Sequence, residues 1–271
     1  MNSGNQEIIR WACATQVDTD AKNEKQETAL IKALKSYQGI EPALYLAEAT
    51  QHPINAVDDK GKTLLHHLVE DGRADNLEAF LKSPYAKDID LNIKDNQGQT
   101  PLITATMNNT VTIMEHLIEA GAHVNATDAY GRTALYVAVS KEMNNTIDLL
   151  LKHDANVLVV PRGDKRSYMH HAAESDSTKF AEKLLNKNVP IDKQDQDGNT
   201  PLHIAAKFNN ASFAEFLLDK GAKTDIVNKV GFSAQDIAKN KSHHPVANMI
   251  RMYDEGTPPR TKYNDRRWNP W

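Results

Sequence analysis

Apolar residues recur along the chain in pairs of short segments, and each segment has the spacing of one face of a helix. In "TPLHIAAKFNNASFAEFLLDKGA", which begins at Thr200, the first segment starts with Leu202 and the second carries Phe213, Phe216 and Leu217. Apolar positions three or four residues apart lie on one side of a helix, whereas a half-buried strand would alternate. A few polar residues separate the two segments. The pattern therefore predicts two short helices joined by a turn.

The same pair of segments returns at a nearly constant interval. A hydroxyl residue precedes the first segment of each pair, and these residues are Thr28, Thr63, Thr100, Thr133, Ser167, Thr200 and Ser233. Successive intervals are 35, 37, 33, 34, 33 and 33 residues. One pair of short helices cannot bury its own apolar face, so neighbouring pairs must stack. We expect seven stacked helix–turn–helix repeats.

Each repeat also carries local signals for where its first helix starts. In the repeat that begins at Thr200, Gly198 suits a turn that requires positive φ. Thr200 is placed to cap the helix, and Pro201 occupies the first helical position, where a missing N–H costs nothing. Ala205 and Ala206 leave room for a neighbouring helix. A short extended piece after the second helix, such as "HVNATD", leads into the next turn.

Together these features resemble the ankyrin repeat: "GNTPLHIAA" opens the repeat, "LLDKGA" ends its second helix and "VNA" precedes the next turn. The resemblance extends over roughly residues 7–253. It implies an all-α ankyrin-repeat solenoid of stacked helix–turn–helix units with short β-hairpin turns. We expect a capping helix within residues 1–19, in which Glu7 to Ala14 forms a half-repeat, about seven repeats over residues 20–255, and a flexible tail over residues 256–271.

Departures from the repeat pattern are informative because folding does not need them. The first full repeat has Gln26 where the turn glycine belongs, about two extra residues near Tyr37 to Glu41, and Pro42 where its second helix restarts. The next repeat has about four extra residues, "YAKD", after its second helix. In "NVLVVPRGDKRS" the turn before Ser167 is apolar and basic instead of polar. That turn is either a tolerated one-residue insertion or a fingertip that contacts a partner.

The residues that could act in catalysis or bind a metal all have a structural role or no matching motif within the repeats. The resemblance implies that His66, His170 and His203 hydrogen-bond to backbone and organise the turn. Adjacent histidines on a helix point in different directions, so the histidine doublets are not expected to chelate a metal. Cys13 has no histidine nearby, no Ser lies in a G-x-S-x-G elbow, and no phosphate-binding loop is present. We expect a protein that is not an enzyme and has no cofactor.

Composition bears on compartment and partners. The 32 basic and 36 acidic residues nearly balance, so the whole chain has no strong attraction to nucleic acid or anionic membranes. No apolar run approaches the roughly 18 residues of a membrane-spanning helix, and the start of the chain lacks a cleavable Sec signal. The lone Cys13 suits a reducing compartment. We expect a cytoplasmic protein, with secretion into a host cell without a Sec signal as the alternative.

The tail that begins at Gly256 differs from the repeats. It has four basic residues against one acid and the aromatic residues Tyr263, Trp268 and Trp271. Such a composition does not support an independent fold. Three interpretations stay open: a disordered or folded-back end, a linear motif that docks into another protein, and an aromatic stack for single-stranded nucleic acid.

These observations favour a monomeric, non-catalytic scaffold that binds another protein. One form of this hypothesis is a bacterial effector that mimics a eukaryotic scaffold. The alternative is a nucleic-acid-associated protein that uses the tail and residues 162–166. The resemblance also makes Asn125 a candidate for hydroxylation in a eukaryotic cell, and it implies that turn tips and first-helix ends line the concave binding face. The residues predicted there are Tyr130, Arg132, Lys141, Leu158, Val160, Arg162, Asp164, Arg166, Asp197, Asn199, Lys207 and Phe208.

Overall fold

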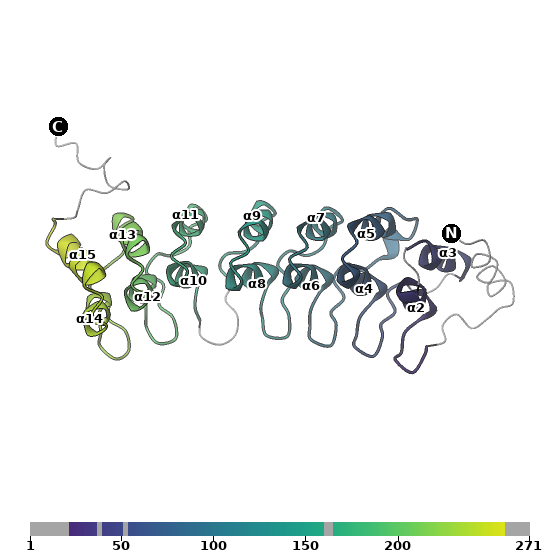
Figure 1. Cartoon of the computed structure of the whole chain (residues 1–271), viewed down its shortest axis with the longest axis horizontal. Helices are drawn as coiled ribbons and strands as arrows, with labels where there is room; N and C mark the ends of the chain where they lie inside the picture. The colour runs from purple at the N-terminus through teal and green to yellow at the C-terminus, as the bar shows by residue number, and fades with distance from the viewer. Residues whose placement is uncertain (1–21, 37–39, 51–53, 160–164, 258–271) are drawn as a thin grey trace, which may run out of the picture. The chain divides into compact units, whose positions relative to one another are not determined.

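The computed structural model describes residues 22–36, 40–50, 54–159 and 165–257. These residues form short helices that come in pairs (Figure 1). The helices are α2 (Ala29–Ser36), α3 (Glu41–Thr50), α4 (Leu64–Asp71), α5 (Ala74–Leu81), the 3-10 helix η1 (Ala86–Asp88), α6 (Pro101–Met107), α7 (Val111–Glu119), α8 (Ala134–Ser140), α9 (Asn144–Lys152), α10 (Tyr168–Glu174), α11 (Thr178–Asn186), α12 (Pro201–Phe208), α13 (Ala211–Asp219), α14 (Ala234–Asn240) and α15 (His244–Asp254).

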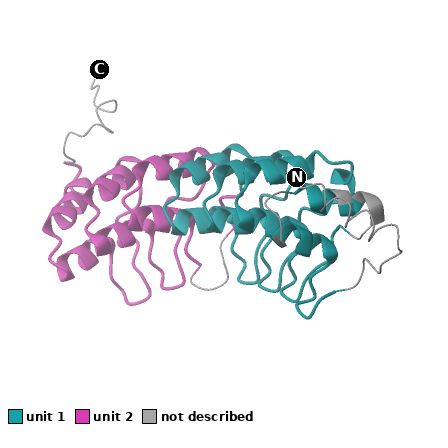
Figure 2. Cartoon of the chain, turned by 45° about the vertical axis from the view of Figure 1, so that its right-hand side comes forward, with its two compact units in different colours: residues 1–155 teal, residues 156–271 magenta. Residues whose placement is uncertain are grey.

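The chain divides into two compact units, Met1–Ala155 and Asn156–Trp271 (Figure 2), and the packing is described within each unit. In the first unit α2, α4, α6 and α8 pack in one row, and α5, α7 and α9 pack in a second row. In the second unit α10, α12 and α14 form one row, and α11, α13 and α15 form the other. Each first helix also packs against the second helix of its own repeat, as α8 does against α9. The predicted all-α stack of helix pairs is confirmed.

The first helices start where the sequence predicts. Thr100 is the N-cap of α6, in the extended conformation, and its hydroxyl oxygen accepts a hydrogen bond from Ile103 N–H at 3.4 Å. The same cap recurs at the other repeats, and Pro101 and Pro201 occupy the first turns of α6 and α12. Since a cap satisfies an N–H that the helix cannot, each of these residues defines where its helix begins.

The turn glycine is required for two reasons, and the structure adds the second. Gly98 has φ of +74°, which a glycine adopts without steric cost. In addition, a Cβ at Gly98 would lie 2.4 Å from the backbone nitrogen of Ala129, in the hairpin of the next repeat. Gln26, which stands at the glycine position of the first full repeat, keeps the left-handed conformation with φ of +56°. The turn geometry is therefore retained where the glycine is lost.

A second set of left-handed residues was not predicted. Each lies nine residues after the N-cap, in the turn between the two helices of a repeat: Asn109, Glu142, Asp176, Asn209 and Ser242, with Gly72 at the same position. Asn209 is the C-cap of α12, with φ of +60°. Asn and Asp tolerate this conformation better than most residues, so a glycine is not needed and the sequence pattern is weak.

The core lies between the two rows of helices within each unit. Phe213 and Leu217 of α13 have no exposed surface, and neither do Ala205 and Ala206 of α12. Because α12 packs against both α10 and α14, the two alanines permit the close approach that the sequence suggested. The connecting turns pair only at the isolated bridges Thr127↔Thr133 and Val227↔Ser233, so the described residues contain hairpin turns but no extended sheet.

The predicted irregularities have definite structures where they are described. Of the extra residues "YAKD", Ala86–Asp88 form the single turn η1 and Tyr85 is its N-cap. Helix α3 begins at Glu41, directly before Pro42. The segment "HPVANMIRMYDEG" forms α15, the last second helix, as expected. The half-repeat expected within residues 1–19, the extra residues 37–39 and the tail from residue 258 lie outside the described residues, so the expected domain boundaries stay predictions.

The last repeat differs from the one before it at positions that pack on a following repeat. Leu202 and Ala206 of α12 are buried, and Gln235 and Lys239 stand at the equivalent positions of α14. Lys239 is exposed. Polar side chains suit the outer face of the last described repeat, because no further repeat follows it among the described residues.

Candidate interaction surface

Among the described hairpins other than the one before Ser167, one side chain at the base holds the backbone of the tip in place. The Oδ1 atom of Asp128 accepts hydrogen bonds from the backbone N–H of Tyr130 and of Arg132, both at 2.9 Å. The backbone closes the same turn, because Asp128 N–H donates to the carbonyl of Arg132. The residues that play the part of Asp128 in the other described hairpins are Asn23, Asp58, Asp95, Asp195 and Asn228. The side chains carried on each tip are thus presented from a fixed backbone.

Neighbouring tips are also joined to one another. In the first unit Asn96 N–H donates to the carbonyl of Lys60 at 2.9 Å, and Ala129 N–H donates to the carbonyl of Gln97 at 3.2 Å. In the second unit Lys229 N–H donates to the carbonyl of Asp197 at 2.9 Å. Within each unit the hairpin tips therefore form a continuous edge, and side chains from successive repeats lie side by side along it.

The repeat histidines link one repeat to the next. Nδ1 of His66 accepts a hydrogen bond from Thr63 N–H at 3.2 Å, so Nε2 carries the proton, and it donates to the carbonyl of Gln99 at 3.1 Å. His170 and His203 make the same two contacts in the second unit. Burial lowers the pKa of His66 and of His203, which favours the neutral ring. The predicted role in organising the turn is confirmed, and the link to the following repeat is an addition.

Ion pairs show which positions face each other across the hairpin side of the first helices. The residue just before each N-cap pairs with the residue seven positions after that N-cap: Lys62 pairs with Glu70, and Glu27 pairs with Lys35 at 2.5 Å. The hydrogen bond from Lys35, with help from Asn23, lowers the pKa of Glu27 to about 2. In the second unit Arg166 pairs with Glu174 at 2.7 Å. The hairpin bases and the last turns of the first helices therefore share one face of each unit.

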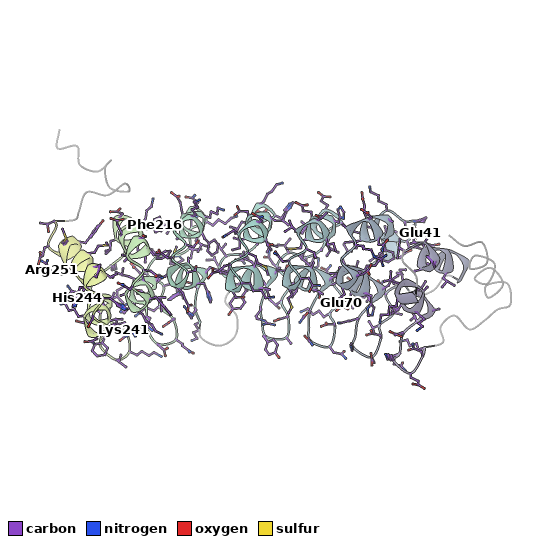
Figure 3. All side chains as sticks on the ribbon, viewed as in Figure 1. Glu41, Glu70, Phe216, Lys241, His244 and Arg251 are labelled. Atoms are coloured by element: carbon purple, nitrogen blue, oxygen red, sulfur yellow. The ribbon has the colours of Figure 1, made fainter. Side chains whose placement is uncertain are left out.

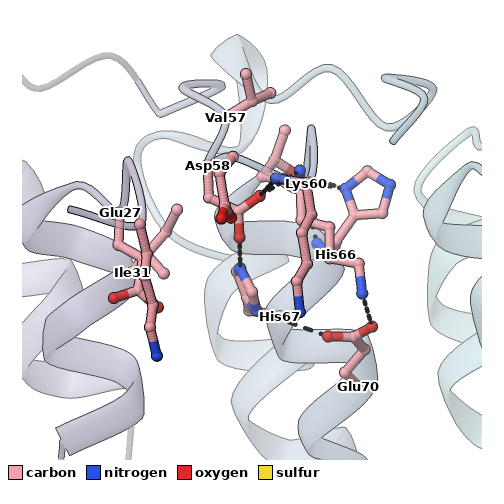
Figure 4. A network of polar contacts seen from close by, with 12 residues as sticks. Glu27, Ile31, Val57, Asp58, Lys60, His66, His67 and Glu70 are labelled. Carbon is pink, nitrogen blue, oxygen red and sulfur yellow. Dashed lines mark hydrogen bonds and ion pairs between the residues drawn. The ribbon is translucent and has the colours of Figure 1, made fainter. Parts of the chain in front are cut away.

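The second histidine of the first doublet belongs to this polar network. His67 Nε2 lies 2.9 Å from the carboxylate of Asp58, and both side chains are buried (Figure 4). Burial lowers the pKa of His67, and nearby Lys35 lowers it further, while Asp58 opposes them. The residues that the structure describes contain no group of three His, Cys, Asp or Glu side chains placed to hold a metal ion. This network supports the base of the hairpin.

Three of the predicted partner-binding residues lie in the first unit. Tyr130 is 65% exposed at its hairpin tip, and the guanidinium of Arg132 lies 4.9 Å from the centre of its ring. Arg132 also pairs with Asp128 at 2.7 Å. Lys141, at the end of α8, is exposed and donates to the carbonyl of Met107 at 3.1 Å. Tyr130 and Arg132 therefore form one exposed, pre-organised aromatic and cationic pair.

The remaining predicted residues belong to the second unit, so the contiguous strip expected across both units stays a prediction. Leu158 is 60% exposed, and Phe208 is 44% exposed with the Lys207 ammonium 5.5 Å from its ring centre. Asp197 is exposed, whereas Asn199 is partly buried and bonds to Asn228 of the next hairpin. Val160, Arg162 and Asp164 lie outside the described residues.

Three exposed apolar residues were missed by sequence reasoning. Val227, Val230 and Phe232 belong to the last hairpin and are 51%, 72% and 43% exposed. Val230 stands at the tip position held by Tyr130 in an earlier repeat, and Phe232 stands where Arg132 does. An alignment of "NKVGFS" with "DAYGRT" would have identified Val230 and Phe232, because they occupy the same tip positions as Tyr130 and Arg132.

The side-chain view relates these residues to the two helical rows (Figure 3). Glu70 and Lys241 mark the ends of first helices α4 and α14, in the rows that carry the hairpins. Phe216 and Arg251 belong to second helices, in the opposite rows. No helix among the residues described is long and apolar enough to cross a lipid bilayer.

Stacked helix pairs with hairpin tips define a repeat protein of the solenoid class. A family model described as "Ankyrin repeats (3 copies)" matches residues 81–161 and 142–228, which together span more than half of the chain. The chain belongs to the ankyrin repeat family.

Three similar proteins illustrate the relationship. The chain is 30% identical over 162 residues to the nuclear factor NF-kappa-B p105 subunit of Gallus gallus, a match that covers 57% of the chain and 16% of that relative. A chain in the solved complex of the predatory endopeptidase Bd0816 of Bdellovibrio bacteriovorus with immunity protein Bd3460 is 30% identical, with a TM-score of 0.62, over 69% of this chain and 96% of that one. The ankyrin repeat domain of Bcl-3, at 22% identity, has a TM-score of 0.71 over 84% of this chain and all of that one, and supports the fold.

Proposed function

We propose that the chain is a non-catalytic scaffold that binds another protein on the face formed by its hairpin tips and first-helix ends. The observation that carries the proposal is the exposure of large apolar and aromatic side chains, Tyr130 and Phe208 among them, at positions where the preceding repeats carry polar residues. Exposed aromatic residues beside cations are typical of interface hot spots. Stacked repeats make such a face continuous over many residues.

The family relationship supports protein binding in general terms. One similar chain comes from a complex between an endopeptidase and an immunity protein, and another relative is a subunit of a nuclear factor. Because the chain spans only 16% of the p105 subunit, that protein's partners are not transferred. The absence of catalysis belongs to this proposal, as do the cytoplasmic location and the monomeric state. Mimicry of a eukaryotic scaffold by a bacterial effector stays a prediction.

Affinity capture with surface and core variants tests the proposal. Tyr130→Ala and Phe208→Ala are expected to cost about 2 kcal/mol or more of partner affinity. The melting temperature should be nearly unchanged, since both side chains are exposed. Leu202→Ala, which empties a buried position, should lower the free energy of unfolding by roughly 2–5 kcal/mol. The proposed face is wrong if Phe208→Ala unfolds the protein while the captured partner still binds Tyr130→Ala with full affinity.

The nucleic-acid alternative makes a different prediction for the same complex. It depends on residues 162–166 and on the tail, most of which lie outside the described residues. Binding through phosphate contacts weakens steeply as salt rises, whereas an interface anchored by aromatic residues weakens less. Measuring the affinity between about 50 and 200 mM salt separates the two functions.

A further inference from the structure

The last two repeats expose more apolar surface than their architecture requires. Val227, Val230 and Phe232 stand within one hairpin, and Phe208 stands at the end of α12. The tip positions of Val230 and Phe232 are held by Lys60 and Lys62 in an earlier repeat, so the turn itself does not need apolar side chains. Single exposed apolar residues are ordinary, but several on adjoining elements mark a binding surface.

This hairpin is already complete as a folded element. Asn228 Oδ1 accepts from the N–H groups of Val230 and Phe232, at 3.2 and 3.1 Å. The carbonyl of Phe232 accepts from Asn228 N–H and from His203 Nε2, and Lys229 N–H donates to the preceding tip. The backbone is therefore held in place, and the apolar side chains project from it without taking part in its hydrogen bonds.

Phe208 lies close enough to the hairpin for one ligand to reach both. His203 of α12 contacts the carbonyl of Phe232 at 3.0 Å, and Phe208 follows His203 by five residues on the same helix. Five residues advance a helix by about 7–8 Å along its axis. An extended peptide covers that distance with about two or three residues. A single short segment can thus contact the hairpin and the end of α12 together.

The charge on these elements is predominantly positive. In α12, in the hairpin segment 221–233, and in α14 with its C-cap, the cations are Lys207, Lys223, Lys229, Lys239 and Lys241, and the anions are Asp225 and Asp236. All five lysines are exposed. Asp236 is engaged with Ser233 in the capping box of α14, at 2.6 Å from its hydroxyl, while Asp225 and the neighbouring tip residue Asp197 are exposed. A ligand for this surface needs apolar side chains and negative charge.

We infer that the last hairpin and the end of α12 bind a short peptide segment of a partner protein in which apolar side chains are flanked by Asp or Glu. This inference rests on the proposed scaffold function and names the chemistry of its partner. The apolar groups contact Val230, Phe232 and Phe208, and the carboxylates pair with the surrounding lysines. An anionic membrane would offer the same charge, but the apolar residues here stand on a rigid hairpin and not on the long amphipathic helix that a bilayer interface favours.

The test uses the full chain as bait for a displayed library of random twelve-residue peptides, followed by fluorescence anisotropy with the enriched sequences. The matched variant is Val230→Asp with Phe232→Asn, which gives the last tip the residues that Asp197 and Asn199 supply in the preceding repeat. The control is Thr112→Asp, which adds a carboxylate at an exposed position of the second helix α7 in the other unit, away from the hairpin tips. Thermal melting should show that both proteins remain folded.

Enriched peptides that combine apolar with acidic residues are expected, with Kd raised at least tenfold by the double variant and unchanged by the control. Lys229→Glu should weaken the same peptides. Enrichment of basic or uncharged peptides, equal binding to the double variant, or no enrichment overturns the inference. Binding to phosphatidylserine vesicles without enrichment of acidic peptides assigns the surface to a membrane and also overturns it. The scaffold function fails separately, when no captured protein depends on any exposed tip residue.

Discussion

Replacing His203 tests whether a buried ring joins consecutive repeats. The side chain is 1% exposed and makes three contacts: Nδ1 accepts from Thr200 N–H at 3.1 Å and lies 2.8 Å from its hydroxyl, and Nε2 donates to the carbonyl of Phe232 at 3.0 Å. The first two contacts cap α12, and the third reaches into the next repeat. His203→Ala removes all three, whereas His203→Asn removes mainly the third.

The last repeat shows why asparagine separates the two effects. Asp236 stands at the histidine position of α14, and its Oδ2 accepts from Ser233 N–H at 2.9 Å. An asparagine at residue 203 offers an oxygen at the same place, so it keeps the cap but cannot reach the next repeat. The two substitutions therefore assign separate free energies to the cap and to the link between repeats.

The expected magnitudes follow from the number of bonds lost. The carbonyl of Phe232 keeps the hydrogen bond from Asn228 N–H, so losing the link costs about the net value of one bond, roughly 1 kcal/mol. His203→Ala also leaves the buried Thr200 N–H without its acceptor, which costs about 1–3 kcal/mol, and empties the ring volume. We expect a loss of about 1–2 kcal/mol for asparagine and about 3–5 kcal/mol for alanine.

Urea unfolding followed by circular dichroism measures both losses in the free energy of unfolding. The control is His244→Ala, because His244 is exposed at the start of α15 and its loss should change stability by less than about 0.5 kcal/mol. The reasoning is refuted if His203→Ala costs no more than His244→Ala. Equal losses for alanine and asparagine would show that the cap of α12 contributes nothing.

Two further predictions concern acid and the turn glycines. Burial lowers the pKa of His66 and His203, so below the ordinary value of 6.5 the unfolded chain binds protons that the folded chain does not. The stability present above that pH is therefore lost as the pH falls below it. The melting temperature should drop between about pH 7.5 and 5.5, and His203→Asn should reduce the drop. Gly98→Ala should lower the melting temperature more than Gly72→Ala, since both have positive φ but only a Cβ at Gly98 would lie 2.4 Å from Ala129; equal effects would show that the backbone conformation alone matters.

The start of each first helix was predictable because its causes are local. The hydroxyl of Thr100 caps α6 by accepting a hydrogen bond from Ile103 N–H, only three residues away, and the proline that follows Thr100 fits the first helical position whatever surrounds it. The left-handed conformation of Asn209 was harder to predict, because several residue types tolerate it and no glycine marks the position in the sequence.

The candidate surface was predicted only in part. Tyr130 and Phe208 were identified because they depart from the polar residues of aligned repeats, and both are exposed. Val230 and Phe232 were missed, although they stand at the tip positions of Tyr130 and Arg132 and an alignment of the hairpins indicates that such positions are exposed. The exposure of a side chain depends on what packs against it, which no local pattern contains.

The repeat period and the helix pairs could be predicted from the pattern of apolar residues, and the resemblance to the ankyrin repeat implied the role of the histidine at the start of α12. The folded structure was needed to show which carbonyl, 29 residues away, accepts the hydrogen bond from His203 and which tip glycine lies against the next hairpin. The folded structure also shows which apolar side chains remain exposed to solvent. Caps and turns depend on contacts between residues close in the chain, whereas the hydrogen bonds that join repeats, and the exposure of a side chain, depend on how neighbouring repeats pack.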